Sequence, residues 1–194
     1  MKLKACTLNE ITEIYNTHLV VDFPKNEVKP LSRITELYEK QLYFAYGLYG
    51  DDHALLAYAF LYAAPNSDYL LLDYFAVLKS MRGEGLGTKV LSLLSTEIET
   101  HFSGLIIEAE NPVFAETAEE KEIRIRRIQF YERNGFERTK ILSRLFGVEY
   151  CILVRTTRAP STLNLTQSVL NTYRTLIPSK HWEKNVSVRI EEDS

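Results

Sequence analysis

Apolar and polar positions in the first half of the chain follow first a helical and then an extended spacing. After Asn9, isoleucine, tyrosine and leucine side chains recur every three or four residues and predict a helix, and a second helix is expected to begin near Pro30-Leu31-Ser32. A short strand is expected before them at residues 2–7. Three runs rich in apolar and aromatic residues follow, separated by Gly, Asp, Asn and Pro residues that favour turns: 42–49, 55–63 and 69–77. The pattern therefore predicts a meander of three antiparallel strands after the two helices.

The second half of the chain alternates between the two spacings. A helix with one continuous apolar stripe is predicted by five residues that stand four positions apart: Leu86, Val90, Leu94, Ile98 and Phe102. A charged helix that ends near residues 131–134 lies among three further strands, expected at residues 105–110, 137–143 and 149–156. The resulting order, β-α-α-β-β-β-α-β-α-β-β, predicts an α/β fold in which helices pack on a central mixed sheet.

A different pattern begins after Arg158-Ala159-Pro160, and we expect the main domain to span residues 1–157. Apolar residues at helical spacing predict a helix over about residues 161–177: Leu165, Val169, Tyr173 and Leu176. Residues 158–194 are too few for a second domain, so they are interpreted as a C-terminal helical extension. The extension is expected to pack on the domain, and two alternatives remain open: a homodimer contact, or a flap over a substrate site.

Composition narrows the functional classes. Hydrophobic residues make up 45% and charged residues 25% of the 194 residues, as in a folded globular protein. Because 23 basic residues are balanced by 26 acidic ones, the net charge of -3 gives no general attraction for nucleic acid or an anionic membrane. Cys6 and Cys151 are interpreted as buried thiols of a reducing cytoplasm, and their spacing from the histidines matches no zinc pattern. The chain shows neither a signal peptide nor a run of about 18 apolar residues, so we expect a cytoplasmic protein without metal, nucleic-acid or membrane partners.

A glycine-rich loop connects the third strand of the meander to the long apolar helix: Arg82-Gly83-Glu84-Gly85-Leu86-Gly87-Thr88. A helix N-terminus carries backbone N–H groups and a partial positive charge, and glycines in front of it allow a phosphate to approach. The spacing G-x-G-x-G differs from the dinucleotide fingerprint, and Thr88 precedes Lys89 where a Walker loop needs the reverse order. The loop therefore predicts an anion site of another kind, with a flexible strand-to-helix turn as the alternative.

Two segments carry a more specific pattern. Val77 stands five residues before Arg82, and the loop continues as R-x-x-G-x-G. Further along, the sequence reads Phe130-Tyr131-Glu132-Arg133-Asn134-Gly135-Phe136. Both segments resemble the GNAT superfamily of acyl-CoA-dependent N-acetyltransferases, whose patterns are V-x-x-x-x-[RQ]-x-x-G-x-[GA] and FYE-x-x-GF. The resemblance covers roughly residues 1–156 and implies a GNAT-like sheet, with acetyl-CoA as cosubstrate.

The resemblance also implies where coenzyme A binds. The strand before the loop is expected to bulge, so that a stretch of its backbone pairs with the pantetheine arm: Phe75, Ala76 and Val77. The pyrophosphate is expected to bind the backbone N–H groups of Gly83, Gly85, Gly87 and Thr88, with Glu84 and Leu86 as neighbours. The Arg82 side chain either adds charge-assisted contacts or points to solvent.

One departure from the family pattern concerns Asn111. Many members have an asparagine seven residues before the tyrosine, and it contacts the pantetheine arm; here Asn111 precedes Tyr131 by 20 residues and is kept as the candidate for that contact. The extra stretch, residues 112–123, leads into two pairs at i,i+4 spacing, Glu120–Arg124 and Glu122–Arg126, which are expected to be surface ion pairs on a helix that begins early. The alternative is an acidic loop that reaches over the acceptor site and attracts a cationic amine.

Acetyl transfer to an amine needs a base for the ammonium, a donor that polarises the thioester carbonyl and an acid for the leaving thiolate. The resemblance implies a backbone N–H near Val77 as the donor and Tyr131 as the acid. For the base, Glu108 is the first candidate, Asp73 the second and a bound-water relay the third. Glu110 has the same parity as Glu108 on its strand and is expected to share its site. Each carboxylate has a structural alternative, as a hydrogen-bonded anchor.

We therefore expect an N-acetyltransferase that moves an acetyl group from acetyl-CoA to a primary amine of a small molecule or peptide by direct attack. A non-catalytic acyl-CoA-binding sensor or regulatory module is the alternative of a different class, and an anion-binding scaffold is a third. The acceptor amine stays open, because one fold serves many acceptors.

Overall fold

A computed structural model describes residues 1–156 and 162–191, and within these ranges eight strands form a mixed sheet in the order β1-β2-β3-β4-β5-β7-β6-β8. The expected mixed α/β fold is confirmed. The chain divides into two compact units. Unit 1 comprises Met1–Ala63 and Leu72–Glu97, and unit 2 comprises Ala64–Leu71 and the described part of Ile98–Ser194.

The strands of unit 1 begin with an antiparallel set. β1 (Lys2–Ala5) pairs with β2 (Tyr43–Tyr49), and β2 pairs with β3 (Leu55–Ala63). β4 (Tyr69–Val77) belongs to this unit from Leu72 onward. β3 is buried on both faces, and its aromatic side chains at every second position share one face: Tyr58, Phe60 and Tyr62. β3 is therefore the central strand of the unit 1 core.

The first helices of unit 1 follow β1 directly. α1 (Leu8–Ile14) begins at a capping box, in which Thr7 Oγ1 accepts from the Glu10 N–H and Glu10 Oε2 accepts from the Thr7 N–H. The helix widens into a π-helical segment (Tyr15–Leu19) and continues as α2 (Val20–Asp22). A loop then leads to α3 (Leu31–Glu39), which buries Ile34 and Leu37. The π-helical segment and α2 contact the aromatic face of β3 at Tyr58, whose hydroxyl donates to Asp22 Oδ2 at 2.9 Å and whose ring lies 6.5 Å from that of His18.

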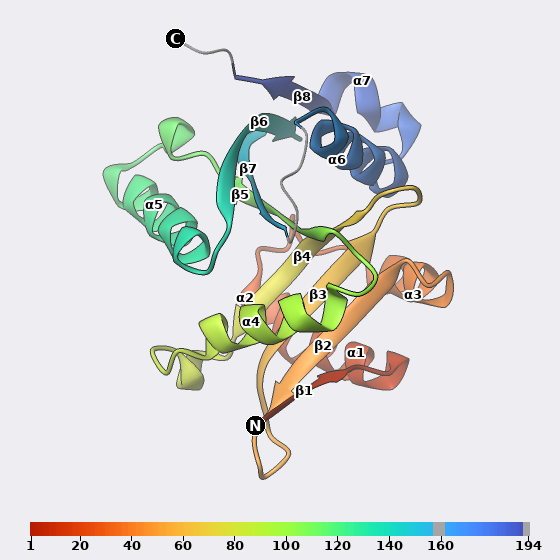
Figure 1. Cartoon of the computed structure of the whole chain (residues 1–194), viewed down its shortest axis with the longest axis vertical. Coiled ribbons are helices and arrows are strands. Elements are labelled where there is room, and N and C mark those ends of the chain that lie inside the picture. The colour runs from red at the N-terminus through yellow and green to blue at the C-terminus, as the bar shows by residue number, and fades with distance from the viewer. Residues whose placement is uncertain (157–161, 192–194) are drawn as a thin grey trace. The chain divides into compact units, whose positions relative to one another are not determined.

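A single long helix completes unit 1. A 3-10 turn (Lys79–Met81) and the glycine loop lead from β4 into α4 (Leu86–Ile98), which is part of this unit as far as Glu97. Figure 1 shows α4 on one face of the unit 1 strands, with α1 and α3 on the other. The glycine loop therefore stands at the N-terminus of a helix that is held by its own buried stripe, which includes Val90 and Leu94.

Unit 2 is built around three antiparallel strands. β5 (Gly104–Glu110) pairs along its whole length with β7 (Val148–Thr156), and β7 forms a hairpin with β6 (Glu137–Leu145). β5 also pairs in parallel with the first residues of β4, Tyr69–Leu71. A 3-10 turn (Pro112–Phe114) leads from β5 to α5 (Ala118–Arg133), whose N-cap is Thr117.

The C-terminal extension belongs to unit 2. It contains α6 (Thr162–Leu176), a 3-10 turn (Ser179–His181), α7 (Trp182–Asn185) and β8 (Val186–Ile190). β8 pairs antiparallel with β6, with Ile190 opposite Ile141 and Val186 opposite Leu145. The expected helix over residues 161–177 is thus present as α6, although residue 161 lies outside the described residues. The extension also contributes a strand, which the sequence analysis did not predict.

The other expected elements are present with small differences in their bounds. β1 ends at Ala5, two residues before the expected end, because the next helix takes Thr7 as its cap. α4 ends at Ile98, whereas the apolar stripe predicted a helix that includes Phe102. The Phe102 N–H still donates to the Ile98 carbonyl (2.9 Å), so the stripe continues in a turn after the helix has ended.

Candidate functional site

The loop between β4 and α4 adopts a conformation that requires glycine. Gly83 has φ +90° and Gly85 has φ +71°, which is the left-handed region that other residues rarely adopt. A Cβ atom at either position would meet no other atom within 4 Å. The backbone conformation, and not lack of space in the protein itself, therefore explains both glycines, and the surface above them is open.

The loop presents backbone donors at the start of α4. The first hydrogen bond into the helix runs from the Lys89 N–H to the Gly85 carbonyl at 3.1 Å. The N–H groups of Leu86, Gly87 and Thr88 precede it, and such first-turn groups have no acceptor within their own helix. The positive end of the helix dipole adds to them, so this end of α4 has the chemistry of an anion site.

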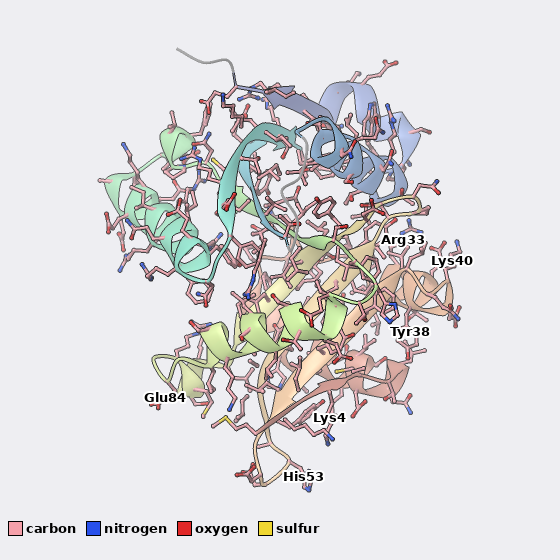
Figure 2. All side chains as sticks on the ribbon, viewed as in Figure 1. Lys4, Arg33, Tyr38, Lys40, His53 and Glu84 are labelled. Atoms are coloured by element: carbon pink, nitrogen blue, oxygen red, sulfur yellow. The ribbon has the colours of Figure 1, made fainter. Side chains whose placement is uncertain are left out.

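Two side chains of the loop differ in their contacts. Arg82 is exposed, and its Nε donates to the Val77 carbonyl at 3.1 Å, which ties the loop to the end of β4. Glu84 is exposed on the loop and is labelled in Figure 2. Arg82 therefore has a positioning contact with the strand, in addition to the two roles considered from the sequence.

Asp73 and Tyr74 are neighbours on β4, which runs unbroken from Tyr69 to Val77. The Tyr43 hydroxyl binds the Asp73 carboxylate, and the rings of Tyr43 and Tyr74 both lie edge-on to Phe60, at 6.0 and 6.3 Å between centroids. Asp73 and Tyr74 therefore both adjoin the aromatic group around Phe60. The bulge that the resemblance implied at Phe75–Val77 stays a prediction.

Asp73 is held by a neighbouring loop. Lys29 Nζ lies 2.7 Å from Asp73 Oδ1, and the Tyr43 hydroxyl donates to the other carboxylate oxygen. Lys29 also donates its backbone N–H to the Tyr74 hydroxyl at 2.9 Å. Burial, and then the charge of Asp73, raise the pKa of Tyr74 to about 12, so this hydroxyl stays protonated. The contacts correspond to the anchoring alternative for Asp73, since they fix the loop between α2 and α3 on β4.

Glu108 lies in a hydrogen-bonded group in unit 2. The Tyr173 hydroxyl of α6 donates to Glu108 Oε1 and lies 2.8 Å from Ser143 Oγ on β6. Ser143 is fully buried and Tyr173 nearly so, while Glu108 is partly exposed. The structure thus brings the first base candidate into contact with the C-terminal extension, which no sequence motif had marked.

Glu110 does not belong to the hydrogen-bonded group of Glu108, Tyr173 and Ser143, although it was expected to share the site of Glu108. Its two carboxylate oxygens accept from Arg124 Nη2 and Arg127 Nη1, each at 3.1 Å. Arg124 also bonds Glu120 at 2.7 Å and donates to the Asn111 carbonyl at 3.0 Å. The interpretation of Arg124 as a surface residue was therefore wrong: it is buried, because its helix packs against the end of β5. Of the two predicted pairs, Glu122–Arg126 is the exposed one, with 3.9 Å between Arg126 Nε and Glu122 Oε1.

Asn111 is buried at the end of β5. Its side-chain oxygen accepts from the Val113 N–H at 3.1 Å and caps the short turn Pro112–Phe114, and its backbone carbonyl binds Arg124. The residue therefore organises the start of the insertion, and this oxygen already has a partner within the chain.

Tyr131 lies at the last turn of α5. Its ring packs against Phe130 and Phe136, at 5.3 and 5.6 Å between centroids. Burial raises its pKa to about 12, and Arg127 lowers it only in part, so the hydroxyl keeps its proton at neutral pH. Gly135 has φ +79° and Phe136 donates its N–H to the Tyr131 carbonyl, which ends the helix. Part of the FYE-x-x-GF pattern is thus a helix-ending signal.

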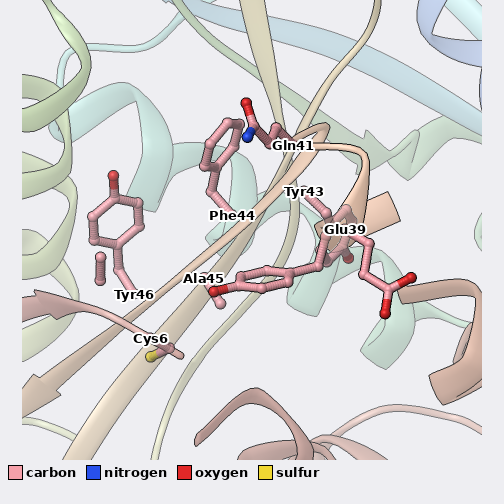
Figure 3. A pocket seen from close by; sticks show the side chains of 9 residues that line it. Cys6, Glu39, Gln41, Tyr43, Phe44, Ala45 and Tyr46 are labelled. Carbon is pink, nitrogen blue, oxygen red and sulfur yellow. The ribbon is translucent and has the colours of Figure 1, made fainter. Parts of the chain in front are cut away.

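A pocket of about 490 Å³ lies in unit 1 between the end of α3 and β2 (Figure 3). Tyr38, Glu39, Phe44 and Tyr46 line it, together with Cys6 beyond β1. The lining residue Tyr43 contacts a catalytic candidate, Asp73. The residues that line the pocket include none of those expected to bind coenzyme A.

Within the described residues, no group of three or more His, Cys, Asp and Glu side chains is placed to hold a metal ion. No helix in the same part of the chain is long and apolar enough to cross a membrane. Cys6 and Cys151 are both buried free thiols, as expected.

Comparison with known proteins agrees with this arrangement. Residues 42–138 match the model of the acetyltransferase (GNAT) domain. Among solved structures, a protein of Bacteroides thetaiotaomicron assigned to the GNAT acetyltransferases superposes with a TM-score of 0.68 at 18% identity, over 91% of this chain and 98% of that one. The ribosomal-protein-S18-alanine N-acetyltransferase of Escherichia coli gives 0.59 at 18% identity, over 83% and 96%. No curated protein matches the sequence.

A third solved structure contains bound ligands. The spermidine N-acetyltransferase of Vibrio cholerae, in complex with CoA and spermine, gives a TM-score of 0.58 at 12% identity, over 80% of this chain and 94% of that one. At these identities the structural matches support the fold, and the matched domain model supports the family.

Proposed function

Because this chain belongs to the GNAT family of acetyltransferases, we propose that it moves an acetyl group from acetyl-CoA to a primary amine of a small molecule or peptide. One observation carries the proposal: the glycine loop opens onto the N-terminus of α4 with two left-handed glycines and no side chain above them. The space over the loop and the donors beneath it fit a pyrophosphate. Since both cysteines are free thiols, we place the enzyme in the cytoplasm.

We assign coenzyme A binding first to the end of β4, the glycine loop and the start of α4. The N–H groups of the loop and first helical turn bind the pyrophosphate: Gly83, Glu84, Gly85, Leu86, Gly87 and Thr88. Arg82, held by the Val77 carbonyl, adds positive charge beside them. The backbone of Phe75–Val77 binds the pantetheine arm. Asn111 is a weaker candidate for that arm, because its side-chain oxygen is already bonded.

The transfer itself needs three groups of the chain. The amine nitrogen attacks the thioester carbon, whose oxygen accepts from a backbone N–H near Val77. The proton lost by the amine passes to Glu108, directly or through a bound water. As the carbon–sulfur bond breaks, Tyr131 donates its proton to the leaving sulfur. Asp73 is assigned an anchoring role, because Lys29 and Tyr43 hold its carboxylate.

Thiol release from acetyl-CoA, measured across a panel of amines, tests this function. The panel includes spermidine, spermine and a peptide with N-terminal alanine, since related folds act on such amines. We expect release with at least one amine, a fall of about 100-fold or more in Tyr131→Phe and in Glu108→Gln, and much smaller losses in Asp73→Asn. Acetyl-CoA binding without release on any amine would favour the sensor alternative instead.

A further inference from the structure

Tyr173 contacts the proposed base from outside the matched domain. The GNAT domain model ends at residue 138, whereas Tyr173 lies on α6 of the C-terminal extension. Its side chain is 2% exposed, and its hydroxyl contacts Glu108 on β5 and Ser143 on β6. Three elements that are distant in the sequence therefore meet at one phenolic oxygen.

The direction of these hydrogen bonds follows from the available protons. An ionised carboxylate only accepts, so the single phenolic proton goes to Glu108, and the Ser143 hydroxyl donates to the phenolic oxygen. Burial, and then the charge of Glu108, hold the pKa of Tyr173 well above its ordinary value, so the donor is present throughout the working pH range. A hydrogen bond to an ionised group in such surroundings is about twice as strong as one between neutral groups.

We propose that Tyr173 is a positioning residue, which holds the Glu108 carboxylate ionised and in one orientation. The C-terminal extension then contributes to the active site of the acetyltransferase, in addition to pairing with β6. The catalytic part of this inference rests on the proposed function, because it takes Glu108 as the base. The hydrogen bond's effect on the Glu108 carboxylate does not depend on that assignment.

Two other ionisable side chains near the pair are Tyr150 and Glu110. Tyr150, on β7, adds to the rise in the pKa of Tyr173, and Ser143 contacts the Tyr173 hydroxyl from β6. Glu110, two residues along β5 from Glu108, is neutralised by Arg124 and Arg127. The neutral phenol of Tyr173 donates directly to Glu108 Oε1.

The direct test is the titration of Glu108, followed by carboxyl-carbon NMR of the full chain and assigned with Glu108→Gln. Removal of a hydrogen bond to the ionised form raises a carboxyl pKa, so we expect Tyr173→Phe to move the Glu108 midpoint upward by about one pH unit. Ser143→Ala should move it in the same direction by less. Thr172→Val is the matched control: it removes a buried hydroxyl from the neighbouring position of α6, and no shift is expected.

Rate measurements then separate the inference from the proposed function. With a panel amine that releases thiol, the acid limb of kcat/KM should move upward in Tyr173→Phe by the same amount as the NMR midpoint. An unmoved midpoint in Tyr173→Phe, with folding confirmed by its spectrum, overturns the inference. An NMR shift without a shift of the acid limb overturns its catalytic part. Unchanged activity in Glu108→Gln instead removes the base assignment of the proposed function and leaves the NMR result intact.

Discussion

Thr172 and Tyr173 are neighbours on α6 with opposite hydrogen-bonding situations. Both side chains are buried, but the Tyr173 hydroxyl has two partners, whereas Thr172 Oγ1 has none among the described residues. A buried polar atom without a partner destabilises the folded state by roughly 1–3 kcal/mol. Substitutions at the two positions therefore measure what a buried hydroxyl contributes to the free energy of unfolding, once with hydrogen-bond partners and once without.

We predict that Thr172→Val stabilises the protein by about 1 kcal/mol, because valine has nearly the same shape and nothing to desolvate. Chemical denaturation measures the change in the free energy of unfolding. Thr175→Val is the control, since Thr175 Oγ1 donates to the Asn171 carbonyl at 2.6 Å and its loss brings no such gain. A lower stability for Thr172→Val would show that the hydroxyl has a partner in solution.

Gly85 and Gly147 give a matched pair for the proposed cradle. Both have positive φ, +71° and +91°, and a Cβ at either meets nothing within 4 Å. Gly85→Ala and Gly147→Ala should therefore lose similar stability, about 1–2 kcal/mol each. Only Gly85→Ala is expected to weaken coenzyme A binding, by at least about tenfold, because its Cβ would occupy the space proposed for the pyrophosphate. Calorimetric titration with coenzyme A measures both variants, and equal affinities would remove the cradle assignment.

At the scale of elements, α5 is attached to β5 through two arginines, Arg124 and Arg127, which both donate to Glu110. Arg124 has 9% of its side chain exposed and joins Glu110, Glu120 and the Asn111 carbonyl. Arg126, two residues further on, is 64% exposed and 3.9 Å from Glu122. Arg124 and Arg126 belong to the same charged helix, but of these two only Arg124 contacts the strand.

We predict that Arg124→Met lowers the free energy of unfolding by about 2–3 kcal/mol, because it removes the buried partner of Glu120, one of the two arginines that bind Glu110 and the donor to the Asn111 carbonyl. The loss stays below that of a fully buried pair, since Glu110 and Glu120 are 27% and 38% exposed. Arg126→Met should change stability by less than about 0.5 kcal/mol, as is usual for surface pairs. Equal effects of the two substitutions in urea denaturation would contradict this difference.

The elements that the sequence predicted are those with a strong local pattern. Apolar spacing was sufficient for β2 to β4, for α4 and for the β6–β7 hairpin. β8 was missed even though Val186, Val188 and Ile190 alternate with polar residues, because five residues are short and the partner strand β6 lies far back in the sequence. The π-helical segment Tyr15–Leu19 could not be predicted, because the spacing of its apolar residues does not differ from that of an α-helix.

In the candidate site, too, residues that are far apart in the sequence could not be predicted to be in contact. The glycine loop was predicted because its strand, glycines and helix are contiguous. The hydrogen-bond partners of the two base candidates were not predicted, because Lys29 is 44 residues from Asp73 and Tyr173 is 65 residues from Glu108. Tyr173 was counted among the apolar positions of its helix, which describes its burial but not its hydroxyl.

At the scale of the whole molecule, buried tyrosines determine the response to alkaline pH. Twelve tyrosines are present in the sequence. Burial raises the pKa of Tyr74 and Tyr131 to about 12, and it moves those of Tyr43 and Tyr173 well above their ordinary value. A raised pKa in the folded state gives stability that is complete below the unfolded value of about 10 and is lost above it.

We therefore predict that Tm is steady from pH 7 to 9 and falls steeply above pH 10. Each such tyrosine contributes about 1.4 kcal/mol per pH unit between pH 10 and its folded pKa. Tyr74→Phe should have a shallower slope above pH 10, whatever its Tm at neutral pH. Scanning calorimetry over this range measures both proteins, and identical slopes would contradict the assignment for Tyr74.

The pairing of β8 with β6 has a consequence for the order in which the protein is made. Every segment of unit 1 has left the ribosome once Glu97 has emerged, whereas unit 2 waits for Val186–Ile190. Until then the outer N–H and C=O groups of β6 have no partner strand, and such an edge readily accepts a strand from another molecule. We therefore expect a chain that stops before Val186 to aggregate or to be degraded, so that loss of β8 lowers the amount of protein in the cell.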